Sequence, residues 1–190
     1  MNMPVAGAPH HSAGDASPWI VRFAPLAVAG GRVLDIACGR GRHSAFFASR
    51  GCHVVAVDRD PEALAALSGV ANVVTVASDL ESDDWPFGRE RFDVVVVANY
   101  LHRALFPSLL RAVADDGLFL YETFAVGNEL YGRPSNPDFL LSEGELLGVV
   151  RNALTVVAFE QGVLAGERPA VVQRLAAVGR GRRWPPPLPP

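Results

Sequence analysis

The stretch Arg32-Val-Leu-Asp-Ile-Ala-Cys-Gly-Arg-Gly-Arg-His43 decides the fold of this 190-residue chain. Its apolar first half predicts a buried strand with a carboxylate, Asp35, near its end. A tight turn follows at Gly39 and Gly41, and an amphipathic helix is expected over residues 41–50. A strand, a glycine turn and a helix N-terminus in this order form a nucleotide-binding site.

A second carboxylate ends the next apolar run. Asp58 lies 17 residues after Gly41, where a carboxylate can accept hydrogen bonds from both hydroxyls of a ribose. Dinucleotide sites have a third glycine where this chain has Ser44, and the acid at Asp35 would repel a pyrophosphate. An acid beside a glycine turn instead suits a cofactor that carries an amine in place of phosphates.

These residues resemble the first motif of the class I S-adenosylmethionine-dependent methyltransferases, an acid followed by Gly-x-Gly-x-Gly. Ala37 stands where the first glycine usually lies, which is tolerable unless the backbone φ angle there is positive. The fuller resemblance covers about residues 18–178 and is to small bacterial methyltransferases of the tellurite-resistance and thiopurine type. It implies S-adenosylmethionine as the cofactor, S-adenosylhomocysteine as its product, and methyl transfer to a small-molecule acceptor.

Apolar strands alternate with helical segments along the chain, which predicts an α/β, Rossmann-like, doubly wound sheet. Seven strands are expected, at residues 32–37, 53–57, 72–76, 92–98, 117–123, 154–161 and 169–177. Helices are expected at residues 18–28, 41–50, 61–68, 102–114 and 143–151. Asp60-Pro61 predicts a helix cap, and Ser142 with Glu145 matches a capping box. Residues 162–168 leave room only for a turn, so we expect a mostly parallel sheet with a C-terminal antiparallel hairpin.

Length and composition limit the class of protein. We expect a disordered leader at residues 1–17, one domain over 18–178 and an Arg/Pro-rich tail at 179–190. No apolar run approaches the ~20 residues that cross a bilayer, and no secretory signal is expected. Cys38 and Cys52 show neither metal-site spacing nor a plausible disulfide. We therefore expect no metal site and a cytoplasmic location.

The charge pattern bears on possible partners. All 17 basic residues are arginine, the net charge is −3, and the arginines are scattered along most of the chain. A nucleic-acid enzyme is expected to carry a clustered basic face, so a small-molecule substrate is favoured over nucleic acid. The oligomeric state stays open.

Ligands of open α/β sheets bind beyond the carboxyl ends of the strands. By resemblance, Asp35 belongs to the network around the methionine part of the cofactor, and Asp58 binds the ribose. Asp79 and Leu80 are placed against the adenine, although a helix cap is the alternative role of Asp79. Arg59 either lies along the adenine face or is solvated. The full set of expected cofactor residues is Asp35, Ala37, Gly39, Gly41, Asp58, Arg59, Asp79, Leu80 and Asn99.

The fourth predicted strand ends in Val97-Ala-Asn-Tyr-Leu-His102, at the family's fourth motif. Asn99 resembles the asparagine of the Asn-Pro-Pro-Tyr motif, but the two prolines are missing, so methylation of a DNA base is not indicated. Tyr100 and His102 are the candidate catalytic residues. The imidazole could act as a general base, since it titrates near neutrality, and a cap or packing role fits it equally well.

The segment from Tyr121 to Leu141 contains a long predicted loop, and such loops are usually functional or disordered. It starts on the ligand side of the sheet, which favours a substrate lid. Arg133 is then a candidate for binding an anionic group of the acceptor. A structural loop that packs its aromatic side chains on the domain is the alternative. The expected lid residues are Phe124, Tyr131, Arg133 and Asn136.

Two other classes of function fit the same motif. One is a non-catalytic module that binds S-adenosylmethionine, and the other is a nicotinamide-dependent oxidoreductase. The missing third glycine disfavours the oxidoreductase. The chain offers no Ser-His-Asp or Cys-His constellation, which is no objection to methyl transfer because that reaction needs no nucleophilic side chain of the enzyme.

Overall fold

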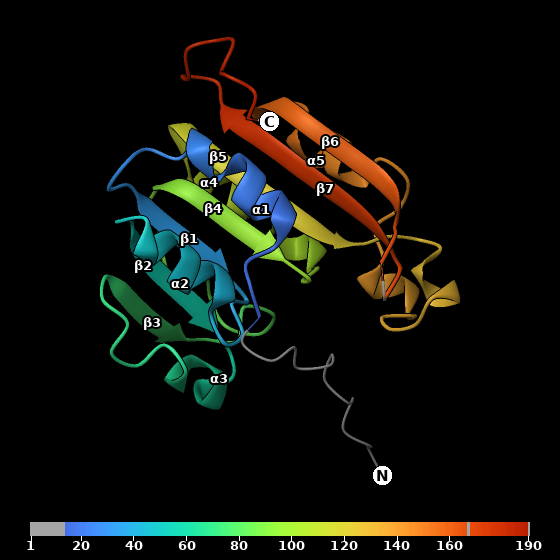
Figure 1. The fold of residues 1–190 in the computed structure, drawn as a ribbon, viewed down its shortest axis with the longest axis horizontal. Helices are drawn as coiled ribbons and strands as arrows, with labels where there is room; N and C mark the ends of the chain where they lie inside the picture. Colours follow the sequence, from blue (N-terminus) through green and yellow to red (C-terminus); the bar gives the residue numbers. More distant parts are fainter. Residues whose placement is uncertain (1–13, 167, 190) are drawn as a thin grey trace.

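The computed structural model describes residues 14–166 and 168–189. In this part of the chain seven strands form one sheet in the order β3-β2-β1-β4-β5-β7-β6 (Figure 1). The strands are β1 (Arg32–Ile36), β2 (His53–Asp58), β3 (Val73–Ala77), β4 (Phe92–Ala98), β5 (Val113–Phe124), β6 (Leu154–Leu164) and β7 (Ala170–Gly179). Strands β1 to β5 are parallel, whereas β7 runs antiparallel to both β5 and β6. The predicted Rossmann-like sheet with a C-terminal hairpin is confirmed.

Helices cover both faces of the sheet. The α-helices are α1 (Pro18–Phe23), α2 (Arg42–Ser49), α3 (Pro61–Ala65), α4 (Phe106–Ala112) and α5 (Glu145–Val150). Short 3₁₀ helices are η1 (Ala24–Leu26), η2 (Arg103–Leu105), η3 (Asn128–Leu130) and η4 (Pro137–Phe139). Helices α1 and α2 pack on one face, through a cluster that includes Trp19, Phe23 and Phe47. Helices α4 and α5 pack on the other.

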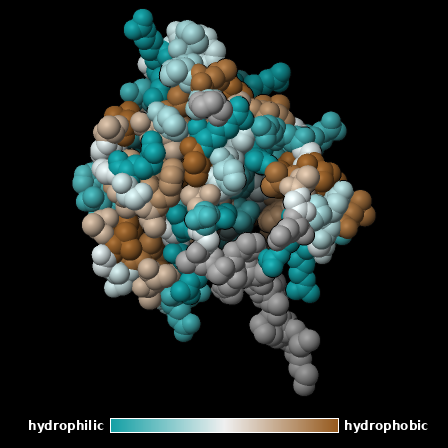
Figure 2. Space-filling view, viewed as in Figure 1, coloured by the Kyte–Doolittle hydropathy of each residue, from teal (hydrophilic) through white to brown (hydrophobic). Residues whose placement is uncertain are grey.

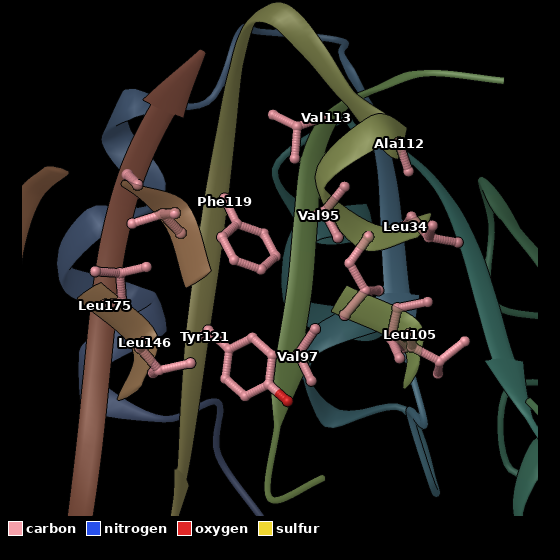
Figure 3. Close-up of a cluster of buried hydrophobic side chains, with 14 of the residues drawn as sticks. Leu34, Val95, Val97, Leu105, Ala112, Val113, Phe119, Tyr121, Leu146 and Leu175 are labelled. Carbon is pink, nitrogen blue, oxygen red and sulfur yellow. The ribbon is translucent and has the colours of Figure 1, made fainter. Parts of the chain in front are cut away.

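The cluster under α4 and α5 contains the largest side chains of the central strands. Phe119 and Tyr121 of β5 lie between Val95 of β4 and Leu146 of α5 (Figure 3). Because both faces of β4 are covered, its residues 94–97 are all fully buried, which explains why this strand reads as an unbroken apolar run. The central strands are thereby held rigid, and their carboxyl ends present the candidate site.

The predicted helix over residues 102–114 is wrong in its extent. A 3₁₀ turn, η2, comes first, and α4 then starts at Phe106 with Pro107 in its first turn, where proline is favoured. From Val113 the chain is extended, and Val113 pairs with Phe92 of β4. Strand β5 is therefore 12 residues long, and its first residues replace the expected end of the helix.

The two predicted caps have different outcomes. The Asp60 carboxylate accepts a hydrogen bond from the backbone N–H of Glu62 (2.9 Å), which confirms the cap of α3. Only half of the expected capping box forms, because the Ser142 N–H donates to the Glu145 carboxylate (2.8 Å) while Gly144, at φ 66°, occupies the N-cap position of α5.

The ends of the chain bear on two sequence expectations. Most of the expected disordered leader, residues 1–13, lies outside the described residues. Near the other end, the Arg182 guanidinium donates to the Leu26 carbonyl (2.5 Å) and Pro186 is buried.

Cys38 and Cys52 are free and buried, as expected. Within residues 14–166 and 168–189, no helix is both long and apolar enough to cross a membrane.

Candidate functional site

The turn between β1 and α2, residues 37–41, is called here the glycine turn. Three of its residues have positive φ angles: Ala37 at 49°, Gly39 at 55° and Gly41 at 77°. The condition under which alanine would be costly is therefore met, since an L-residue in the left-handed region costs about 1–2 kcal/mol. Non-glycine residues held in that region cluster at functional sites.

The two glycines of the turn serve different purposes. A Cβ atom added to Gly39 would meet no atom within 4 Å, so the backbone there faces open space that a ligand can approach. A Cβ added to Gly41 would lie 2.4 Å from the side chain of Leu67. Gly41 therefore allows the turn to pack against the chain after α3, and only Gly39 leaves its backbone accessible.

Asp35 lies beneath the glycine turn and is 1% exposed. Its carboxylate accepts a hydrogen bond from the Ser44 hydroxyl of α2 (2.6 Å). Burial raises the pKa of Asp35 from its usual 3.8 to about 6, and the hydrogen bonds from Ser44 oppose that rise. The serine at the position of the third dinucleotide glycine is thus the partner of the buried acid.

Asp58, at the end of β2, fixes the turn from the side. Its carboxylate accepts hydrogen bonds from the backbone N–H groups of Gly39 (2.7 Å) and Asp60 (2.9 Å). A carboxylate has about four lone-pair directions, so Asp58 keeps capacity for the hydroxyls of a ribose. The same residue therefore orders the turn and offers acceptors beside it.

The loop after β3 carries the residues expected near the adenine. Asp79 accepts a hydrogen bond from the Glu81 N–H (3.1 Å), and its own N–H donates to the Asp83 carboxylate (2.8 Å). It therefore caps a turn, which is close to the alternative role that the sequence leaves open. Leu80 is buried in the core beside this turn, and Arg59 is exposed.

The segment after β4 combines backbone strain with two candidate catalytic side chains. Asn99 adopts φ 56° and its N–H donates to the Glu122 carbonyl (2.9 Å). Tyr100 is half-buried, and burial together with the charges of Glu81 and Asp79 raises the pKa of its phenol. Tyr100 therefore lies on the adenine side of the expected site. His102 is half-buried at the start of η2.

The β5–α5 segment, residues 125–144, contains most of the expected lid. Phe124, just before it, is half-buried, whereas Tyr131 and Arg133 are exposed. Asn136 caps η4 by accepting a hydrogen bond from the Asp138 N–H (3.0 Å). The structure thus gives Asn136 a local role and presents Tyr131 and Arg133 to solvent.

Viewed from the side shown in Figure 2, the surface is hollowed between the end of β4 and the part of the β5–α5 segment that carries η3 and η4. Hydrophobic side chains gather on this part of the segment. Its exposed large apolar residues are Val126, Leu130, Tyr131 and Phe139. Apolar surface of this kind next to polar groups is typical of a small-molecule site.

Two residues of this region were missed in the sequence. Asn128 is 1% exposed, donates to the Pro134 carbonyl (3.0 Å) and accepts from the Val171 N–H of β7 (3.1 Å). Arg103 makes two hydrogen bonds to carbonyls of the returning half of the segment and two to Glu145 at the start of α5. A lone asparagine in a polar loop and an arginine beside a candidate histidine carry no periodic signal, so only three-dimensional proximity identifies them.

His43, at the start of α2, is buried and has a structural role. Its Nε2 accepts a hydrogen bond from the Ser17 N–H (3.3 Å), and burial lowers its pKa to about 3. Within the described residues no group of three or more His, Cys, Asp or Glu side chains is arranged to hold a metal ion.

Comparison with known proteins gives a consistent family. Residues 33–117, a little under half of the chain, match the family model described as "Methyltransferase domain". Over 99 residues the chain is 36% identical to a demethylmenaquinone methyltransferase of Clavibacter sepedonicus, covering 47% of this chain and 40% of that protein. Over 84 residues it is 34% identical to an uncharacterized methyltransferase of a Synechocystis strain, covering 44% and 39%. The chain thus spans about two fifths of the length of these curated relatives.

Solved structures share the fold. TehB from Haemophilus influenzae superposes with a TM-score of 0.70 at 18% identity, covering 84% of this chain and 61% of that one. A 1,6-didemethyltoxoflavin-N1-methyltransferase from Burkholderia thailandensis, solved with its substrate and S-adenosylhomocysteine, superposes with a TM-score of 0.60 at 24% identity, covering 84% and 75%. Both structures share the fold over 84% of this chain, which agrees with the fold that the resemblance implies.

Proposed function

We propose that this protein, whose residues 33–117 match a methyltransferase domain, transfers a methyl group from S-adenosylmethionine to a small-molecule acceptor. The observation that carries the proposal is the glycine turn, in which Gly39 faces open space while Asp58 holds its N–H. The two curated relatives and the Burkholderia thailandensis structure reported above are methyltransferases by name, which supports this function over a nicotinamide-dependent oxidoreductase.

The residues around the turn fit this cofactor better than a dinucleotide. S-adenosylmethionine carries an ammonium and a sulfonium, and the carboxylate of Asp58 borders the open backbone of Gly39, while Asp35 is buried near the end of the preceding strand. A pyrophosphate at the same place would meet the carboxylate of Asp58. Asp58 would hold the ribose, and Asp79 with Leu80 would border the adenine.

When bound, the cofactor supplies a methyl group that its sulfonium makes electrophilic. The chain then has to orient the acceptor in line with the breaking C–S bond and exclude water. Burial and the nearby carboxylates raise the pKa of Tyr100, so its hydroxyl stays protonated at neutral pH and does not act as a base. His102 is the group that would accept a proton from an acceptor that carries one.

The β5–α5 segment is proposed as the acceptor side of the site. Phe124 contributes an apolar wall at the end of β5, and the exposed Arg133 is available to an anionic acceptor. A domain over residues 18–178, a cytoplasmic location and a partner limited to small molecules belong to the same proposal.

Calorimetric titration with S-adenosylmethionine, S-adenosylhomocysteine and NAD tests the proposal. We expect binding of the first two, and a loss of about tenfold or more in affinity for Asp58→Ala, since hydrogen bonds to a charged group contribute about 1.5–3 kcal/mol. Asp35→Ala is expected to weaken binding as well. Asp116→Ala, at an exposed carboxylate remote from the turn in sequence, is the matched control.

Two outcomes would contradict the assignment. Saturable NAD binding with no heat from S-adenosylmethionine would exclude the methyltransferase, and normal cofactor binding by both Asp35→Ala and Asp58→Ala would exclude this cofactor site. Tight cofactor binding without methyl transfer to any compound of an acceptor screen would instead favour the non-catalytic module.

A further inference from the structure

Arg103 connects the segment after β4 to the β5–α5 segment. Its guanidinium donates to both carboxylate oxygens of Glu145 (2.7 and 3.0 Å) and to the carbonyls of Asp138 (2.8 Å) and Leu140 (2.8 Å). Arg103 directly follows His102 in the chain. One side chain thus joins the candidate catalytic segment to η4 and to the start of α5.

Glu145 is itself fixed on the other side. Burial opposes its ionisation, but hydrogen bonds from Arg103 and from the Ser142 N–H outweigh burial, and the pKa of Glu145 is lowered. The hydrogen bond to Glu145 also raises the pKa of Arg103. Both groups are therefore charged at every pH at which the protein is expected to work.

The contact differs from an ordinary surface ion pair. Exposed pairs contribute about 0–1 kcal/mol, and the pair of Arg32 with Glu90, whose side chains are 48% and 54% exposed, is of that kind. Arg103 is 41% exposed, but Glu145 is only 18% exposed, and the guanidinium also donates to two backbone carbonyls. The planar guanidinium of an arginine has several N–H donors and can bind a carboxylate and two carbonyls at once, whereas the ammonium of a lysine cannot.

The other attachments of the β5–α5 segment are at its base. Val126 N–H donates to the Leu141 carbonyl (2.9 Å), Leu141 N–H donates to the Phe124 carbonyl (3.0 Å), and Asn128 bonds to β7. These contacts bring the two ends of the segment together beside β5 and β7. Among the hydrogen bonds of the described residues, those of Arg103 tie the segment to the stretch that carries Tyr100 and His102.

We propose that Arg103 is a positioning residue that fixes the β5–α5 segment against the loop after β4, and so sets the wall of the acceptor side. The proposal rests on the proposed methyl transfer, because only that function gives the wall an acceptor. It predicts that loss of Arg103 loosens this segment and leaves the cofactor side, built on β1 to β3, unchanged.

Hydrogen exchange read by mass spectrometry tests this in the full chain without any acceptor. In Arg103→Ala we expect amides of residues 126–141 to exchange about tenfold to hundredfold faster, because hydrogen bonds to a charged group are lost. Amides of β1 and β4 should keep their rates, which a general loss of stability would not allow. The affinity for S-adenosylhomocysteine should stay within about twofold of the wild-type value, which corresponds to a change of less than about 0.4 kcal/mol in the binding free energy.

Three further variants make the result specific. Arg103→Lys is expected to restore only part of the protection, since it can pair with Glu145 but cannot also reach both carbonyls. Guanidinium ion at low millimolar concentration should restore protection in Arg103→Ala, while the same concentration of sodium ion should not. Arg32→Gln removes an exposed ion pair at the first residue of β1, the end of the strand away from the candidate site. It should leave the hydrogen-exchange rates of residues 126–141 unchanged.

Unchanged exchange of residues 126–141 in Arg103→Ala would overturn the proposal. So would equal acceleration in β1 and β4, or a loss of S-adenosylhomocysteine binding that matches the loss of protection. Binding of S-adenosylhomocysteine by the wild-type protein tests the methyltransferase function separately, so failure of one conclusion is distinguishable from failure of the other.

Discussion

Replacing Asp35 by asparagine should change how the stability of the free protein depends on pH. The carboxyl group is 1% exposed, and burial raises its pKa from 3.8 to about 6. Asparagine has nearly the same shape and can still accept the hydrogen bond from the Ser44 hydroxyl, but it does not ionise. The substitution therefore removes one titration and keeps most of the packing.

The direction and size of the change in unfolding free energy with pH follow from the pKa values of Asp35 in the folded and unfolded states. The folded state holds its proton more tightly than the unfolded state, so this stabilising contribution is complete below pH 3.8 and is lost as the pH rises through about 6. A difference of about two pKa units corresponds to about 3 kcal/mol, of which about 2.4 kcal/mol falls between pH ~4 and ~7.5. Asp35→Asn should lack this loss.

The measurement is the free energy of unfolding in urea, without cofactor, at several pH values between about 4 and 8. The difference between the variant and the wild type should move in favour of the variant by roughly 2 kcal/mol as the pH rises. A constant cost of placing an amide at this site does not affect that change. Asp116→Asn, at an exposed carboxylate, should follow the wild type. A difference between Asp35→Asn and wild type that stays flat over the whole pH range would refute the reasoning.

Three further predictions concern the turn, the tyrosines and the β5–α5 segment. Gly41→Ala should lower the free energy of unfolding by about 2–4 kcal/mol, because the new methyl group overlaps Leu67 and φ is 77°. Leu67 is buried and its truncation is costly by itself, so Gly41→Ala is also measured in the Leu67→Ala background, where its cost should fall to the backbone part; full tolerance of Gly41→Ala in thermal unfolding would contradict this. Burial raises the pKa of Tyr100 and of Tyr121. In an alkaline absorbance titration, no more than one of the three tyrosines should therefore ionise by about pH 11 while the circular dichroism spectrum stays native. Ionisation of two tyrosines in the folded protein would contradict the burial seen in the structure. Asn128→Ala leaves two backbone partners without a bond and should cost about 2–3 kcal/mol in urea unfolding, with faster proteolysis inside residues 125–144; equal proteolysis rates would show that Asn128 does not hold the segment.

The sequence predicted the sheet well because its signals are local. Each parallel strand is a short apolar run bounded by turn residues, and the room left by residues 162–168 required a hairpin. The helix expected over residues 102–114 failed because Val113 finds a strand partner, Phe92, that no local pattern reveals. Tertiary pairing outweighed the helical periodicity there.

The candidate site was predictable only in part, for a similar reason. Asp35, Gly39 and Asp58 belong to a motif with fixed spacing, and the structure brings them together around one turn. The sequence indicates that alanine at position 37 would be costly if its φ were positive, but only the structure shows that it is. Arg103 acts through carbonyls near residue 140, and a backbone carbonyl carries no residue type that a sequence could show.

The position of β7 has a consequence for how the protein is made. This strand is the last in the chain, yet it lies inside the sheet between β5 and β6, and its Leu175 carbonyl accepts the indole N–H of Trp19 (3.3 Å). Helix α1 is therefore synthesised before β7 and obtains this partner only after residues 170–179 have left the ribosome. During synthesis β5 is the open edge of an unfinished sheet, which is the state in which strands of different chains can pair wrongly. Synthesis of residues 170–179 is thus the step that supplies this hydrogen-bond partner to α1.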